Sequence, residues 1–137
     1  MMRIARSQNK PLFFAASSRK DLKAFPGEVQ SEVGFALWDV QNGRTPHGAK
    51  PMKGFGGGVT VMELVADYHT DTYRAVYTAK FADAVFVLHC FQKKSKRGIA
   101  TTQADVDLIA ARLKEAARFY KQWKEQQDEP ILKEGDK

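Results

Sequence analysis

Three apolar runs rich in β-branched and aromatic residues follow one another in the second half of the chain, and they constrain its fold more than any other feature. The runs read VTVMELVA (59–66), TYRAVYTAKFA (72–82) and AVFVLHCF (84–91). Only DYHTD (67–71) separates the first two, and the turn at Asp83 separates the last two. Connectors this short join antiparallel neighbours, because parallel strands need a crossover of a dozen or more residues. The sequence therefore predicts a meander, whose third run is apolar on both faces and most buried.

Before the meander, the sequence predicts a short strand and two helices. The segment KPLFFAA (10–16) is short, apolar and aromatic, which indicates the strand. Ser18 begins a capping-box pattern for one helix, Pro26 suits the first turn of the next, and Gly43 ends it. Apolar residues of the second helix recur at helical spacing, namely Val29, Val33, Leu37 and Val40. These pieces predict a helical hairpin.

After the meander, residues 101–127 form the longest helical pattern. Thr102 is a plausible N-cap, and Asp105 complements the positive end of the helix dipole. The apolar stripe of this helix consists of Val106, Ile109, Leu113, Ala116, Tyr120 and Trp123. Residues 128–137 contain a proline and few apolar side chains, which predicts a loose tail. We therefore expect one α+β domain over residues 1–127, with a small antiparallel sheet, an N-terminal helical hairpin and a long C-terminal helix.

Positive charge is concentrated in the second half of the chain. The formal net charge is +6, and the segment from Arg74 to Lys124 has a balance of +7. The remaining residues together have a balance of −1. This distribution favours an anionic partner, which the composition leaves open as RNA, DNA or an acidic protein.

Several kinds of site and location are disfavoured by the sequence. Cys90 is the only cysteine, so no internal disulfide is possible, and the three histidines are too dispersed for a zinc motif. The Gly/Pro-rich segment 43–58 lacks the Gly-Lys-Ser/Thr ending of a P-loop, so we interpret it as a connector. The first residues are too polar for a signal peptide, and no apolar run is long enough to span a membrane. We expect a soluble, cytoplasmic protein that needs no metal or cofactor.

The order of these elements resembles the RelE/ParE toxin superfamily, and most of all the phage-derived, HigB-like branch of toxin–antitoxin systems. The resemblance extends from about Lys10 to Tyr120. Three features carry it: a Tyr-Arg pair that begins a strand (YRAVY), an apolar strand that ends in Phe before a Lys-Lys-Ser turn (VLHCFQKKS), and a helix soon afterwards.

The resemblance implies a RelE-like fold, neutralisation by a helix-turn-helix antitoxin and, in many members, metal-independent cleavage of mRNA on the ribosome. Members of the ParE branch instead poison DNA gyrase. By position, Arg74 matches the arginine of the Tyr-Arg strand, while Lys93 and Lys94 match the basic residues after the last strand. These three are the expected catalytic residues. One departure is that RNA-cleaving relatives often have a Leu-Arg pair where this chain has Leu64 and Val65.

Cleavage of RNA without a metal requires attack by the 2′-hydroxyl and stabilisation of charge on the phosphoryl oxygens, and an arginine fork suits the second task. Strand alternation predicts that Arg74 and Lys80 share a face. The residues expected to hold the RNA backbone are Lys53, Lys80, Lys96 and Arg97. The alternatives are an ion pair between Arg74 and Glu63 or a carboxylate of the last helix, and a solvated turn at residues 93–97.

The general acid and base stay open. His89, His47, His69 and Tyr77 are candidates, but His89 equally suits a satisfied core histidine and Tyr77 suits packing. Cys90 has no paired base at a recognisable spacing.

Three functions remain: an RNA-cleaving toxin, a non-enzymatic ParE-like gyrase inhibitor that acts through its helical hairpin, and a phage-derived nucleic-acid-binding module without toxicity.

Overall fold

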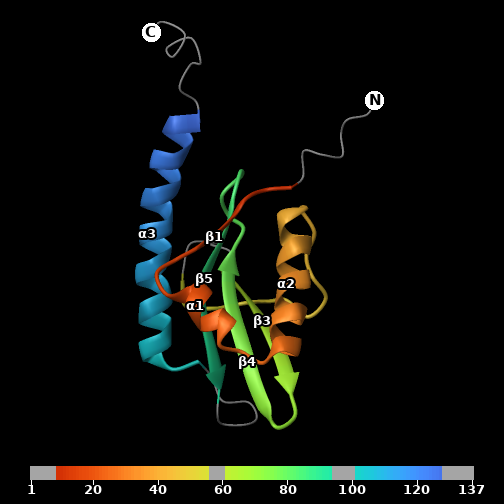
Figure 1. The fold of residues 1–137 in the computed structure, drawn as a ribbon. Helices are drawn as coiled ribbons and strands as arrows, with labels where there is room; N and C mark the ends of the chain where they lie inside the picture. Colours follow the sequence, from red (N-terminus) through yellow and green to blue (C-terminus); the bar gives the residue numbers. More distant parts are fainter. Residues whose placement is uncertain (1–8, 56–60, 94–100, 128–137) are drawn as a thin grey trace, which may run out of the picture.

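The computed structural model of the chain describes residues 9–55, 61–93 and 101–127 (Figure 1). In chain order, the elements are β1 (Leu12–Phe14), α1 (Ser18–Lys23), α2 (Gly27–Gln41), β2 (Lys50–Pro51), β3 (Val61–Tyr68), β4 (Asp71–Thr78), β5 (Val85–Lys93) and α3 (Gln103–Gln127). The strands form one sheet in the order β1-β5-β4-β3-β2. None of the described helices combines the length and the apolar character that a bilayer crossing demands.

The α+β fold, the helical hairpin, the meander and the long C-terminal helix are confirmed. β3 pairs antiparallel with β4, and β4 pairs antiparallel with β5. The sheet is mixed, however, because β1 pairs parallel with β5. This pairing was not predictable from connector lengths, since it joins the first and last strands in chain order across about half of the sequence.

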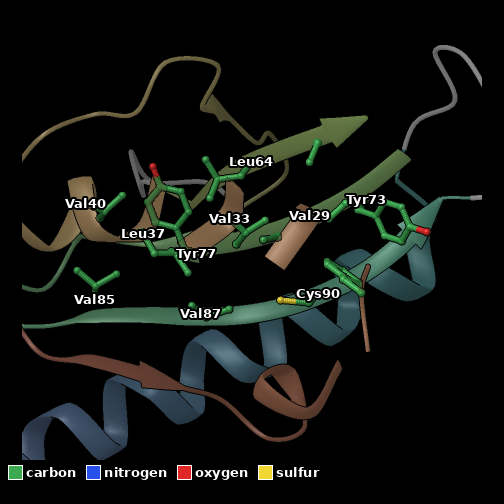
Figure 2. Close-up of a cluster of buried hydrophobic side chains, with 13 residues drawn as sticks. Val29, Val33, Leu37, Val40, Leu64, Tyr73, Tyr77, Val85, Val87 and Cys90 are labelled. Atoms are coloured by element: carbon green, nitrogen blue, oxygen red, sulfur yellow. The ribbon is translucent and has the colours of Figure 1, made fainter. Parts of the chain in front are cut away.

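Each face of the sheet carries its own hydrophobic core, with α2 over one face and α3 over the other (Figure 1). Figure 2 shows the α2 core, in which Val33 and Leu37 pack over Tyr77 and the buried side chains of β5. On the opposite face, Ile109 of α3 packs in a cluster with Val76 of β4. The residues of β4 therefore alternate between the two helices, as the sequence predicts.

A β-bulge in β5 breaks this alternation. Val76 pairs with His89 whereas Tyr77 pairs with Val87, so Leu88 is the extra residue. Leu88 packs in the α3 core, and His89 contacts α3 as well, so two consecutive side chains are directed to the same face. The Nη1 atom of Arg112 on α3 donates a hydrogen bond to the Leu88 carbonyl at 2.9 Å. This bond satisfies a backbone acceptor at the bulge, where the ladder is disrupted.

Packing of α2 on the sheet provides a direct test of the fold. Leu37 is 2% exposed, whereas Phe35 of the same helix is 74% exposed. We expect Leu37→Ala to lower the free energy of unfolding by about 2–5 kcal/mol, because it leaves a cavity in the core. Phe35→Ala should change it by less than about 0.5 kcal/mol. Urea denaturation of both variants measures the difference, and equal losses would contradict the packing of α2.

Candidate functional site

The α3 face of the sheet carries a polar cluster where β4 and β5 lie beside the start of α3. We define the polar cluster as Glu63 on β3, Arg74 on β4, His89 and Lys93 on β5, and Asp105 on α3. The register explains why these side chains meet. Arg74 pairs with Phe91, and Lys93 pairs with Thr72, so Arg74 and Lys93 are diagonal neighbours on one face. The structure thus brings two of the expected catalytic residues together.

The guanidinium of Arg74 is held by Glu63. Arg74 Nη1 donates a hydrogen bond to Glu63 Oε2, and the two side chains are 18% and 11% exposed. Burial lowers the pKa of Arg74 from its ordinary value. The Nε atom of Arg74 is buried and has no hydrogen-bond partner within the structure. The ion pair left open as an alternative is therefore present, and it neutralises Arg74 while one guanidinium N–H stays without an acceptor.

The second acid–base pair of the polar cluster joins β5 to α3. His89 Nε2 lies 2.9 Å from Asp105 Oδ1, and the imidazole stacks on Phe91 with ring centroids 4.5 Å apart. Asp105 is itself fixed at the start of α3, because its Oδ2 accepts a hydrogen bond from Thr102 Oγ1 at 3.0 Å. His89 is only 8% exposed, and its Nδ1 has no hydrogen-bond partner within the structure.

This geometry determines which nitrogen of His89 carries the lone pair, although that nitrogen, Nδ1, is buried. A carboxylate at Nε2 favours the tautomer that carries its hydrogen there, which leaves the lone pair on Nδ1. A base oriented by a carboxylate is the arrangement that general-base catalysis uses. From the sequence alone, His89 suited a buried core histidine equally well, because its partner Asp105 lies on a different element. The capping pattern of Thr102 and Asp105 was visible, but its link to His89 was not.

A further cation lies on the same face and was missed. Lys50 of β2 pairs directly with Glu63 of β3, so the two side chains share a face, and Lys50 is exposed. With Arg74 and Lys93, they form a diagonal row of charges across β2 to β5. The register of β2 could not be predicted, because β2 is a two-residue strand within the Gly/Pro-rich connector.

The other predicted backbone-binding lysines lie elsewhere. β4 ends at Thr78, so the alternation does not extend to Lys80, whose Nζ lies 5.1 Å from the centroid of the Phe81 ring. Lys53 follows Met52, whose N–H bonds to the carbonyl of Val61 at this same end of the sheet. Both lysines are exposed at the end of β4 opposite to Lys93. Lys94, Lys96 and Arg97 lie outside the described residues.

The remaining acid–base candidates do not reach the polar cluster. Tyr77 faces the α2 core, and burial raises its pKa to about 12. Burial also raises the pKa of the Cys90 thiol to about 12, so this thiol is unreactive at neutral pH. His47 is exposed in the connector, and His69 is exposed in the β3–β4 turn. Across residues 9–55, 61–93 and 101–127, no three His, Cys, Asp or Glu side chains gather as a metal-ligand set.

Comparisons with known proteins agree with the sequence resemblance. The model of a family described as phage-derived protein Gp49-like matches residues 20–114, a segment that contains all five residues of the polar cluster. Its phage origin accords with the branch that the sequence resembles.

A search of curated proteins finds no match. Among solved structures, the chain is similar to one from the toxin–antitoxin complex RelBE2 of Mycobacterium tuberculosis, with 19% identity and a TM-score of 0.43. That match covers 66% of this chain and 99% of the other.

The contact between Glu63 and Arg74 predicts energetic coupling. We expect Glu63→Leu and Arg74→Met each to lower the free energy of unfolding by about 2–4 kcal/mol, because each leaves a largely buried charge without its partner. The double variant should lose less than the sum, with a coupling of about 1–3 kcal/mol. Chemical denaturation of the four proteins measures the cycle. Additive losses would show that the two side chains do not interact.

Proposed function

Because the chain belongs to the family of phage-derived Gp49-like proteins, we propose that it is the toxin of a toxin–antitoxin pair, as its resemblance to the RelE/ParE superfamily implies. The α+β fold, with a helical hairpin and a long C-terminal helix on opposite faces of one sheet, supports this proposal. Its place of action would be the cytoplasm, where translated mRNA is found.

The activity that we propose is cleavage of RNA, and the observation that supports it is the polar cluster. One face carries a carboxylate-oriented imidazole, the guanidinium of Arg74 and Lys93. In the proposed step, RNA binding exposes the buried Nδ1 of His89. This atom accepts the proton of a ribose 2′-hydroxyl, and the 2′-oxygen attacks the adjacent phosphorus. The bond to the 5′-oxygen breaks, and this oxygen takes a proton from Lys93 or from water. The products are a 2′,3′-cyclic phosphate and a 5′-hydroxyl.

Each residue has a distinct role in this step. A positioned general base contributes about 10²- to 10⁴-fold to the rate, which is the part we assign to His89. Arg74 stabilises the negative charge that develops on the phosphoryl oxygens, a role worth about 3–4 kcal/mol per donor. Because Glu63 occupies Nη1 and Nε is buried, the phosphate would compete with Glu63 for the guanidinium. Lys93 and Lys94 would bind the scissile phosphate, while Lys96 and Arg97 would hold the backbone beyond it.

A second candidate function is a non-enzymatic inhibitor of the ParE kind. The observation that favours it is the ion pair of Arg74 with Glu63, which reduces the positive charge available to a phosphate. The absence of lysine from β3 (Val61–Tyr68) points in the same direction. Such a protein would bind DNA gyrase through its helical hairpin and would leave RNA intact.

Induced expression followed by mapping of transcript ends tests the first function against the second. We expect cuts inside translated codons. His89→Gln should reduce cleavage about 10²- to 10⁴-fold, because the amide retains a hydrogen bond to Asp105 but cannot accept a proton as a base. Arg74→Lys, which keeps the charge but removes the planar fork, should reduce it about 10²-fold or more.

Lys121→Gln is the matched control, because Lys121 is exposed toward the C-terminal end of α3, away from Asp105 at its start, and this variant should cleave like the wild type. Intact transcripts together with double-strand DNA breaks would support the inhibitor instead. Intact transcripts without DNA damage or growth arrest would leave the nucleic-acid-binding module as the surviving hypothesis.

The proposed partner is a helix-turn-helix antitoxin encoded by a neighbouring gene. An acidic segment of such a protein would cover the cations of the α3 face. We expect the affinity of the purified complex to fall steeply as salt rises from about 0.1 M to 1 M, because the screening length shortens from about 10 Å to 3 Å. Titration calorimetry at several salt concentrations measures this slope. An affinity independent of salt would indicate a mainly apolar interface.

A further inference from the structure

The outer face of α2 carries an exposed aromatic patch that the proposed RNA cleavage does not use. Phe35 is 74% exposed and Trp38 is 48% exposed, which makes them two of the most exposed large apolar side chains in the described part of the chain. Ser31, Gly34, Phe35 and Trp38 follow the spacing i, i+3, i+4, i+7, so they form one stripe along the helix. Exposed apolar patches of this kind typically mark interaction sites.

The shape around the stripe suits a partner that approaches closely. A hollow of about 430 Å³ is lined by Ser31, Gly34, Phe35 and Trp38. A second hollow, of about 210 Å³, lies on the other side of Phe35, between α2, the connector at Pro46–Gly48 and β3. A Cβ atom at Gly34 would meet nothing within 4 Å, so packing within this chain does not require glycine there. Glycine weakens a helix, but it allows another backbone to approach.

The charge of this region is opposite to that of the chain as a whole. α2 contains Glu28, Glu32 and Asp39 and no lysine or arginine, although the net charge of the protein is +6. Glu32 and Asp39 line the second hollow. Arg44 pairs with Asp39 at 2.9 Å and offsets one of the three negative charges. A net negative rim therefore remains beside the aromatic stripe.

We propose that this α2 surface, defined by Ser31, Glu32, Gly34, Phe35, Trp38 and Asp39, binds an amphipathic helix of another protein that carries lysine or arginine beside its apolar stripe. The i, i+3, i+4, i+7 arrangement matches the way in which helices present anchors to one another. The negative rim selects a basic partner and repels an acidic one. It also disfavours a symmetric dimer through α2, because such a dimer would place the acidic rims of the two copies together.

This inference does not depend on RNA cleavage. The α2 surface and the polar cluster lie on opposite sides of the sheet. α2 covers one face (Figure 1), whereas Arg74 lies two residues from Val76 of the α3 core and shares the other face with it. A basic partner on α2 and an anionic partner on the α3 face can therefore bind at the same time.

Selection from a display library of helical peptides, randomised along one face, tests the proposal with the full-length protein as bait. We expect the enriched peptides to combine an apolar stripe with flanking lysine or arginine. Phe35→Ser/Trp38→Ser should weaken their binding about tenfold or more, because these side chains are the apolar anchors. Glu32→Gln/Asp39→Asn should weaken basic peptides more than neutral ones.

Phe119→Ser on α3 is the matched control, because it removes another exposed aromatic side chain, 44% exposed, from a different face. It should bind the enriched peptides like the wild type. Circular dichroism checks that each variant is folded. Failure to enrich any peptide, enrichment of peptides with acidic flanks, or equal binding by the Phe35/Trp38 variant would overturn the proposal. A dimer by light scattering that the Phe35/Trp38 variant abolishes would assign the surface to a second copy of the chain and overturn it as well.

Discussion

The β-bulge at Leu88 is the constraint on which the arrangement of the polar cluster depends. In a regular strand, Leu88 and His89 would face opposite sides of the sheet, and His89 would lie in the α2 core beside apolar side chains. The bulge directs both to α3, where Leu88 joins the core and His89 reaches Asp105 at 2.9 Å. Arg112 compensates the disrupted ladder through the Leu88 carbonyl. One extra residue thus serves packing and chemistry together.

Local pattern predicted most of the fold, because helical periodicity and strand alternation are properties of short segments. The stripe of α2 and the faces of β4 follow from such patterns and are confirmed. Long-range pairing was not predictable in the same way. The parallel contact of β1 with β5 and the register of Lys50 against Glu63 depend on how distant segments meet. No local propensity encodes either of them.

The contacts of the candidate site were likewise predictable only where they are set by neighbouring segments. The convergence of Arg74 and Lys93 follows from the alternation of two adjacent strands, and the structure has it. The carboxylate partners of Arg74 and His89 come from other elements, so sequence alone left both contacts open. The prediction that Lys80 shares a strand face with Arg74 was wrong, because β4 ends at Thr78 before it reaches Lys80. The residues that sequence placed best are those whose neighbours are set by a hairpin.

The two faces of the molecule differ in the sign of their charge, and this difference limits which partners each face can bind. On the α3 face, each acid of the polar cluster is paired with a base, so a phosphate at the proposed site would have to compete with Glu63 for Arg74. Such competition favours a ligand with several anionic groups, because Lys50 and Lys93 flank the pair and add attraction that a single phosphate does not use. On α2, the acids Glu28 and Glu32 stand beside exposed aromatic side chains, which suits a basic protein surface. A polyanion is therefore directed to one side of the sheet and repelled from the other.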